Sequence, residues 1–138
     1  MSVNQAFGYA FGGVYILVGL LGFLVTGGVD LASPDGGLLL GIFEVNPLHN
    51  VVHLAIGAGF IAGAAGGLGS SRMVNTAIGG TYVLVALAGL AVPADSGANI
   101  LALNAADHLL HFGSGAAALA VGLAADRARV REGATRAA

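Results

Sequence analysis

The sequence predicts an all-α integral membrane protein with four transmembrane helices built from two parallel helix–loop–helix repeats. Three observations support this fold class. The 138 residues are 57% hydrophobic and only 9% charged, whereas about a quarter of the residues in a soluble domain are charged. Four segments are apolar over the roughly 17–25 residues that a spanning helix needs. A polar motif, and the helix before it, each occur twice.

The first predicted helix runs from about residue 7 to residue 27. A polar connection follows, and its Gly27-Gly28 and Ser33-Pro34-Asp35-Gly36-Gly37 are strong turn signals. The next apolar segment, Leu38–Val45, is too short to cross a membrane and carries Glu44. We therefore expect this segment to lie on the bundle as an interfacial or re-entrant piece.

The second predicted helix begins at a polar motif. Asn46 is a favoured N-cap and Pro47 a favoured first helical residue, so a helix should start here and run to about Gly66. The third helix is expected over about residues 76–92, because Pro93 and the turn residues after it end the apolar stretch.

The fourth predicted helix resembles the second. A short apolar piece, residues 98–103, leads to Asn104 as the N-cap, and Asp107 occupies the place of a capping-box acid. The helix should continue to about Ala125. Residues 126–138 form a polar, arginine-containing tail.

The motif N-x-x-[HD]-[NH]-x-x-H-[LF] occurs at residues 46–54 and again at residues 104–112, and all four histidines of the chain lie within it. The preceding helices also match: residues 12–22 and 79–89 align almost position by position, each with Gly-Gly-x-Tyr. The chain therefore contains an internal duplication that includes both helices of each half.

The duplication divides residues 1–138, a single domain, into one repeat at about 7–66 and another at about 76–125. Each repeat has two helices, so both begin on the same side of the membrane. They are then parallel repeats about an axis along the membrane normal. The two motif helices should meet at this axis.

Charge predicts the orientation, with both termini cytoplasmic and the motifs near the extracytoplasmic surface, because arginines favour the cytoplasmic side. The second connection and the tail contain the arginines: Arg72, Arg127, Arg129, Arg131 and Arg136. The other two connections contain acids: Asp30, Asp35, Glu44 and Asp95. The N-terminus lacks the basic region of a cleaved signal peptide, so we expect the first helix to be retained.

Composition excludes several classes of function. The chain has no cysteine, which rules out disulfides and thiolate metal sites, and two methionines give little support for a copper(I) site. A net charge of −2 without a basic stripe gives no support for nucleic-acid binding. No nucleophile, phosphate loop or acid–base pair stands out, so the sequence favours a non-catalytic role.

Four motif side chains are candidate metal ligands. Residues four apart share a helix face, so His49 and His53 point the same way, as do Asp107 and His111. If the two helices meet at the axis, three His and one Asp converge. That set suits zinc, iron or manganese.

Neighbouring polar residues extend this candidate site. His108 is a further candidate ligand, since it adjoins Asp107. Four further side chains could orient the ligands through hydrogen bonds: Glu44, Asn50, Asn46 and Asn104.

Two alternatives remain open. The His, Asn and Asp side chains could form only a hydrogen-bond network, with Tyr15 and Tyr82 joining it or simply packing, in a structural or accessory subunit of a membrane complex. Alternatively, His53 and His111 could be paired axial ligands of a haem. Helix faces rich in Gly and Ala, at residues 57–63 and 113–117, allow close approach and lead us to expect a homo-oligomer or a membrane-complex partner.

The doubled motif, the Gly-Gly-x-Tyr helices and the four-span layout resemble the bacterial membrane family catalogued as domain of unknown function 4383. The resemblance extends over about residues 7–125. It implies the four-helix membrane architecture and no particular activity.

Overall fold

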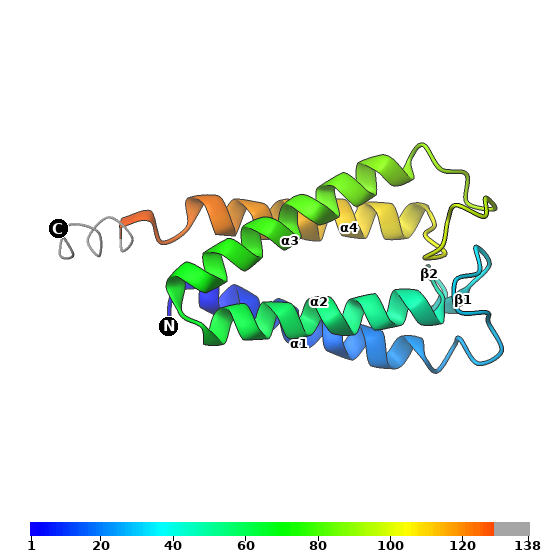
Figure 1. Ribbon diagram of the computed structural model, residues 1–138, viewed down its shortest axis with the longest axis horizontal. Helices are drawn as coiled ribbons and strands as arrows, with labels where there is room; N and C mark the ends of the chain where they lie inside the picture. Colours follow the sequence, from blue (N-terminus) through cyan, green and yellow to red (C-terminus); the bar gives the residue numbers. More distant parts are fainter. Residues whose placement is uncertain (129–138) are drawn as a thin grey trace.

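The computed structural model describes residues 1–128, in which the chain forms a bundle of four helices with a small β-hairpin at one end (Figure 1). Helix α1 begins and α4 ends at the same end of the bundle, and the hairpin and the α3–α4 loop lie at the other end. The elements are α1 (Val3–Gly22), β1 (Gly37–Leu39), β2 (Phe43–Val45), α2 (Pro47–Ala65), α3 (Leu68–Gly89) and α4 (Ala105–Ala124).

The all-helical prediction is confirmed, and α2 and α4 begin and end within one residue of the expected positions. The bounds of the other two helices were wrong at both ends: α1 ends at Gly22 rather than near residue 27, and α3 ends at Gly89 rather than near residue 92. Helix α1 begins at Val3 because Ser2 and Gln5 form a capping box. Helix α3 begins at Leu68 rather than near residue 76. Its first turns are polar, but Asn75 is fully buried and its Nδ2 donates to Asn4 Oδ1 at 3.0 Å. Polar side chains that donate hydrogen bonds inside the bundle, as Asn75 does, therefore allow the helix to begin earlier.

The segment expected as one interfacial or re-entrant piece is instead an antiparallel hairpin, β1–β2, in which Leu38 pairs with Glu44. Leu40 and Gly41 both adopt positive φ, at 55° and 72°, as a tight hairpin turn requires. The sequence lacks the Asn-Gly or Asp-Gly signal typical of such turns, so the hairpin was not predictable from local chemistry.

Glycines bring the two helices of each repeat into backbone contact. A Cβ atom placed on Gly12 would lie 2.8 Å from the carbonyl oxygen of Gly57, and one on Gly57 would lie 2.8 Å from that of Gly12. In the second repeat, Gly79 and Gly115 meet in the same way, at 2.8 and 3.0 Å. The α1–α2 and α3–α4 pairs are therefore packed equivalently.

The two repeats also exchange equivalent contacts at the loop end. The Nδ2 of Asn46 donates to the carbonyl of Ile100 at 2.8 Å, and the Nδ2 of Asn104 donates to the carbonyl of Ile42 at 2.9 Å. These are corresponding positions of the two repeats. Reciprocal contacts of this kind are what a twofold axis produces. The two halves therefore make equivalent contacts with each other at the loop end of the bundle.

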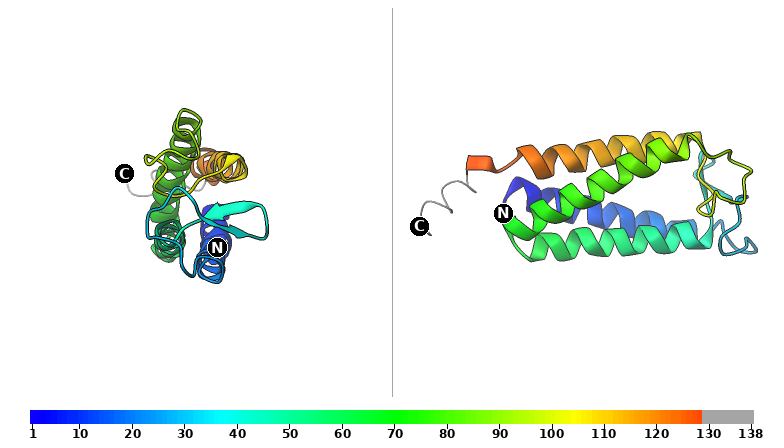
Figure 2. Two further views of the ribbon diagram at one scale, coloured as in Figure 1. Left: turned by 90° about the vertical axis from the view of Figure 1, so that its right-hand side faces the viewer. Right: turned by 45° about the horizontal axis from the view of Figure 1, so that its top comes forward.

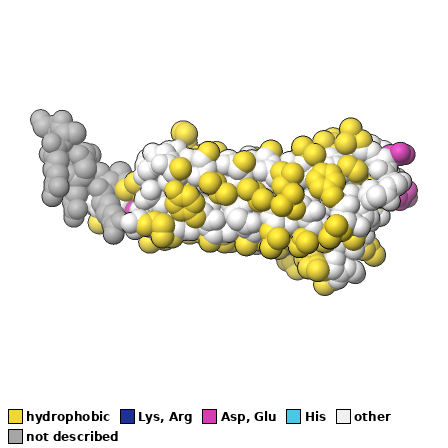
Figure 3. All heavy atoms as spheres, turned by 90° about the horizontal axis from the view of Figure 1, so that it is seen from below, with side chains coloured by type: hydrophobic (Ala, Val, Ile, Leu, Met, Phe, Trp, Pro, Cys, Tyr) yellow, Lys and Arg dark blue, Asp and Glu magenta, His cyan; other side chains and the backbone are white. Residues whose placement is uncertain are grey.

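The bundle buries polar groups and exposes apolar ones. Four asparagines are at most 1% exposed, while large apolar side chains on α1, α3 and α4 are more than half exposed, among them Leu17, Val14, Met73, Leu84 and Leu109. Figure 3 shows hydrophobic side chains over the helices and acids gathered at the loop end. Among the described residues, α1 and α2 are long and apolar enough to cross a membrane.

Candidate metal centre

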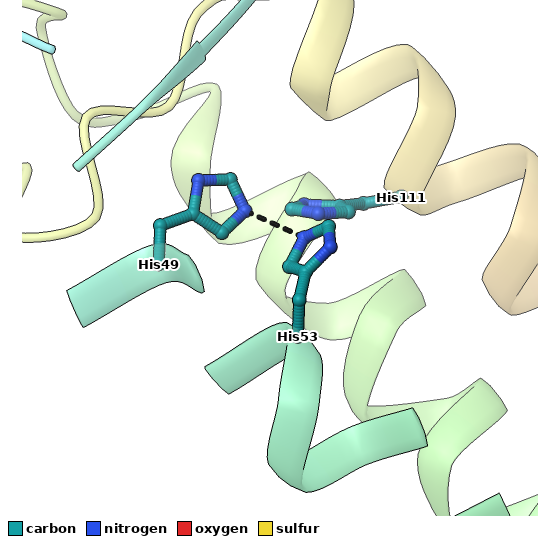
Figure 4. Close-up of side chains that lie close together, drawn as sticks. All are labelled: His49, His53 and His111. Carbon is teal, nitrogen blue, oxygen red and sulfur yellow. Dashed lines mark hydrogen bonds between the residues drawn. The ribbon is translucent and has the colours of Figure 1, made fainter. Parts of the chain in front are cut away.

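Three of the four histidines meet between α2 and α4 near the loop end of the bundle (Figure 4). We call His49, His53 and His111 the triad. All three are buried, at 1%, 5% and 3% exposure. The Nε2 atoms of His49 and His53 share a hydrogen bond of 2.8 Å, and one potential ligand nitrogen from each ring lies within 4.8 Å of the other two.

Local sequence positions the triad. Asn46 caps α2 by accepting a hydrogen bond from the backbone N–H of His49 at 2.8 Å, and Pro47 starts the helix. His49 and His53 then lie one turn apart on the face directed at the bundle axis. His111 occupies the same place in α4 that His53 occupies in α2. In the end view of Figure 2, α2 and α4 lie diagonally across the bundle, and the triad nitrogens from these two helices lie within 4.8 Å of one another.

The triad lines a cavity of about 70 Å³ between α2, α3 and α4. Within residues 1–128, the buried polar atoms without a hydrogen-bond partner are Nδ1 of all four histidines, Asn75 Oδ1 and the Tyr82 hydroxyl, so they are not confined to the triad. Each unpaired buried polar group costs about 1–3 kcal/mol. What fits a metal ion is the placement of the rings: three imidazoles line one small interior space and bring a ligand nitrogen each within 4.8 Å of the others.

Asp107 has a different set of partners. Its Oδ2 accepts hydrogen bonds from the backbone N–H groups of Asn104, at 3.0 Å, and Glu44, at 3.1 Å. The carboxylate thus caps α4 and attaches β2 to it, as a capping-box acid does. Asp107 is not in the triad. Glu44 turns its own carboxylate to the backbone N–H of Gly36, at 2.9 Å.

His108 and Asn50 occupy equivalent positions outside the triad. The His108 ring packs against Gly89 of α3, and the Asn50 side chain packs against Gly22 of α1, which is the corresponding glycine of the first repeat. Asn50 also donates to the Thr26 hydroxyl at 3.1 Å. These side chains face the paired helix of their own repeat, because one residue along a helix turns by about 100°.

Two tyrosine rings pack against the histidines of the triad. The Tyr82 ring lies 4.8 Å from the His111 ring, and the Tyr15 ring lies 5.3 Å from the His53 ring, measured between centroids. The doubled Gly-Gly-x-Tyr pattern was the sequence signal for this pair. Thr81 and Leu101 also line the cavity, and no pattern in the sequence marked them.

Residues 5–124, which include both repeats and the whole triad, match the model of a family described as "Domain of unknown function (DUF4383)". No curated protein and no solved structure matches the chain. The description states no activity, so function has to be argued from the site itself. Because the match spans most of the chain, this protein belongs to the DUF4383 family.

Proposed function

We propose that this protein is a membrane protein that binds one divalent transition-metal ion through His49, His53 and His111. The observation that carries the proposal is the convergence of three buried imidazoles, from two helices, with ligand nitrogens within 4.8 Å of one another. Imidazole suits zinc and iron, and manganese when oxygen ligands complete the shell. Three protein ligands leave a position for water or another ligand, as in catalytic zinc sites.

A small adjustment brings the triad to coordination distance. Two nitrogens bound to a tetrahedral zinc ion, each at about 2.0–2.1 Å, lie about 3.3 Å apart. The Nε2 atoms of His49 and His53 are 2.8 Å apart. An ion would replace this hydrogen bond, with the nitrogens of His49 and His53 moving apart and that of His111, within 4.8 Å of both, moving closer.

The size of the cavity favours an ion over haem. About 70 Å³ is enough for an ion and a water ligand, since one water occupies about 30 Å³ in the liquid. A haem held between His53 and His111 would place a porphyrin where Tyr82 and Tyr15 pack against these rings. The helices would have to separate to admit it.

A purely structural network is the second candidate, and the hydrogen bond between His49 and His53 favours it. Asp107 and the two capping asparagines hold the loops in any case, and interhelical polar contacts of this kind stabilise membrane bundles by about 0.6–2 kcal/mol each. His111 counts against this alternative: within residues 1–128 its ring makes no hydrogen bond to His49 or His53, so a hydrogen-bond network alone gives no reason for its place in the triad.

Metal content tests the proposal directly. The full chain, purified in mild detergent and exchanged into lipid nanodiscs, is incubated with zinc, iron(II) or manganese(II) and then separated from free ion. Elemental analysis should find about one retained ion per chain for at least one metal, and the absorption spectrum should lack a haem band. A chain that retains none of the three metals after saturation contradicts the proposal and leaves the structural network.

The membrane placement extends to all four helices in this proposal. Helices α3 and α4 expose Leu87, Leu84, Leu109 and Phe112 as fully as α1 exposes its leucines. Arg72 and Arg127 lie at the end where α1 begins, opposite the acidic loops, which supports cytoplasmic termini and a triad near the extracytoplasmic surface. Arg129, Arg131 and Arg136 lie outside the described residues.

Reporter fusions test this topology. A reporter that is active only in the cytoplasm should work when it is fused after Ala138 and fail when it is inserted at Ser96, in the α3–α4 loop. A reporter active only outside the cytoplasm should give the opposite pattern. If the two fusions behave alike, α3 and α4 do not both cross the membrane.

A further inference from the structure

A groove of about 670 Å³ lies between α1 and α4, on the side of the bundle that the hairpin overhangs (Figure 2, left). Its volume is within the roughly 300–1,000 Å³ of small-molecule sites. The hairpin closes one end of the groove through Ile42 and Phe43. Most of the wall is aliphatic or aromatic and includes Phe11, Val14, Val18, Leu109, Leu110 and Ala117.

The polar side chains of the groove lie together on its inner wall. The Tyr15 hydroxyl donates to Ser114 Oγ at 2.9 Å, and Ser114 Oγ donates to the carbonyl of Leu110 at 2.7 Å. His53 lies beside them and lines both the groove and the triad cavity. A molecule in the groove would therefore touch one of the three triad histidines while the rest of it contacts apolar side chains.

We propose that this groove binds a free lipid-soluble molecule, an apolar chain that carries one hydroxyl or protonated carboxyl group. The chain would lie along α1 and α4, and the polar group would lie beside His53 and donate its hydrogen to the Tyr15 or Ser114 oxygen, because both hydroxyl hydrogens are already donated. Water-soluble ligands fit poorly, because the groove offers them few polar contacts and opens on a face of exposed apolar side chains. The inference rests on the membrane placement proposed above and does not require the metal.

A larger side chain at Gly113 should block the groove. It lines the groove, and a Cβ atom placed on it would meet nothing within 4 Å, so Gly113→Leu can project into the groove without disturbing the helices. Gly80 of α3 has the same open surroundings and does not line the groove. Gly80→Leu is therefore a matched control for the added side chain and for the glycine replacement.

The experiment uses the full chain in nanodiscs and hexadecanoic acid with a diazirine in mid-chain. After irradiation, mass spectrometry should locate the label on residues 106–117 and 11–18, and excess unlabelled hexadecanoic acid should displace it. We expect Gly113→Leu to lower this labelling at least tenfold and Gly80→Leu to leave it unchanged. Tyr15→Phe should raise the acid concentration needed for half-displacement about 2- to 10-fold, the effect of one hydrogen bond.

Three results would overturn the inference. Label spread over the outer faces of all helices, or insensitive to Gly113→Leu, would make the groove ordinary lipid-facing surface. Labelling only by a phosphatidylcholine with the same diazirine chain would assign the groove to a bilayer lipid. A dimer that Gly113→Leu dissociates would assign it to a second copy of this chain. Metal retention, measured on the same samples, is independent of all three results.

Discussion

Gly79→Ala is expected to destabilise the bundle by at least about 3 kcal/mol, the upper range for overpacking, whereas Gly80→Ala should have no destabilising effect. The added methyl group at residue 79 would lie 2.8 Å from the carbonyl oxygen of Gly115 and closer still to the backbone of Leu119. Backbone atoms cannot move aside as a side chain can, so α3 and α4 would have to separate. At Gly80 nothing lies within 4 Å, and alanine there strengthens the helix by about 0.5–1 kcal/mol.

The first repeat supplies an independent copy of this comparison. Gly12 contacts the backbone of α2, and nothing lies within 4 Å of a Cβ atom on its neighbour Gly13. Thermal unfolding of the four alanine variants in one detergent should give large drops in midpoint for Gly12→Ala and Gly79→Ala only. Equal midpoints within either pair would mean that the helices of that repeat are not held by backbone contact.

The helices and the triad were predictable where short-range rules apply. Asn46 and Asn104 are capping residues at the start of apolar stretches, and they set α2 and α4 within one residue. Once these helices are fixed, the spacing of His49 and His53 places both rings on one face. The duplication then brings His111 to the equivalent face of α4, so three of the four primary candidate ligands converge.

Asp107 could not be assigned from sequence because two roles compete for the same carboxylate. A capping acid and a metal ligand have identical local signatures at this position. The partner that distinguishes them, the backbone N–H of Glu44, comes from a hairpin 63 residues earlier in the chain. The repeats differ here: Asp107, which corresponds to His49, accepts hydrogen bonds from backbone groups, so the three expected imidazoles converge without the expected carboxylate.

His53→Ala and His111→Ala are each expected to weaken metal binding by more than about 100-fold. Loss of a residue that only hydrogen-bonds to a metal ligand already lowers metal affinity about 10- to 100-fold. Both side chains are buried in the triad, and the remaining two nitrogens cannot complete a stable first shell. The affinity is measured by competition with a chromophoric chelator, and the thermal midpoint of each variant checks that it remains folded.

His108→Asn and Asp107→Asn are the matched controls, and both should bind the ion within about threefold of the parent chain, a difference of less than 1 kcal/mol. Asparagine already occupies the position equivalent to His108, at Asn50, where it packs against a glycine as His108 does. In Asp107→Asn the amide oxygen can still accept from the backbone of Asn104 and Glu44, so α4 keeps its cap. If Asp107→Asn loses the ion as fully as His111→Ala, the carboxylate is a fourth ligand and the three-histidine centre is wrong.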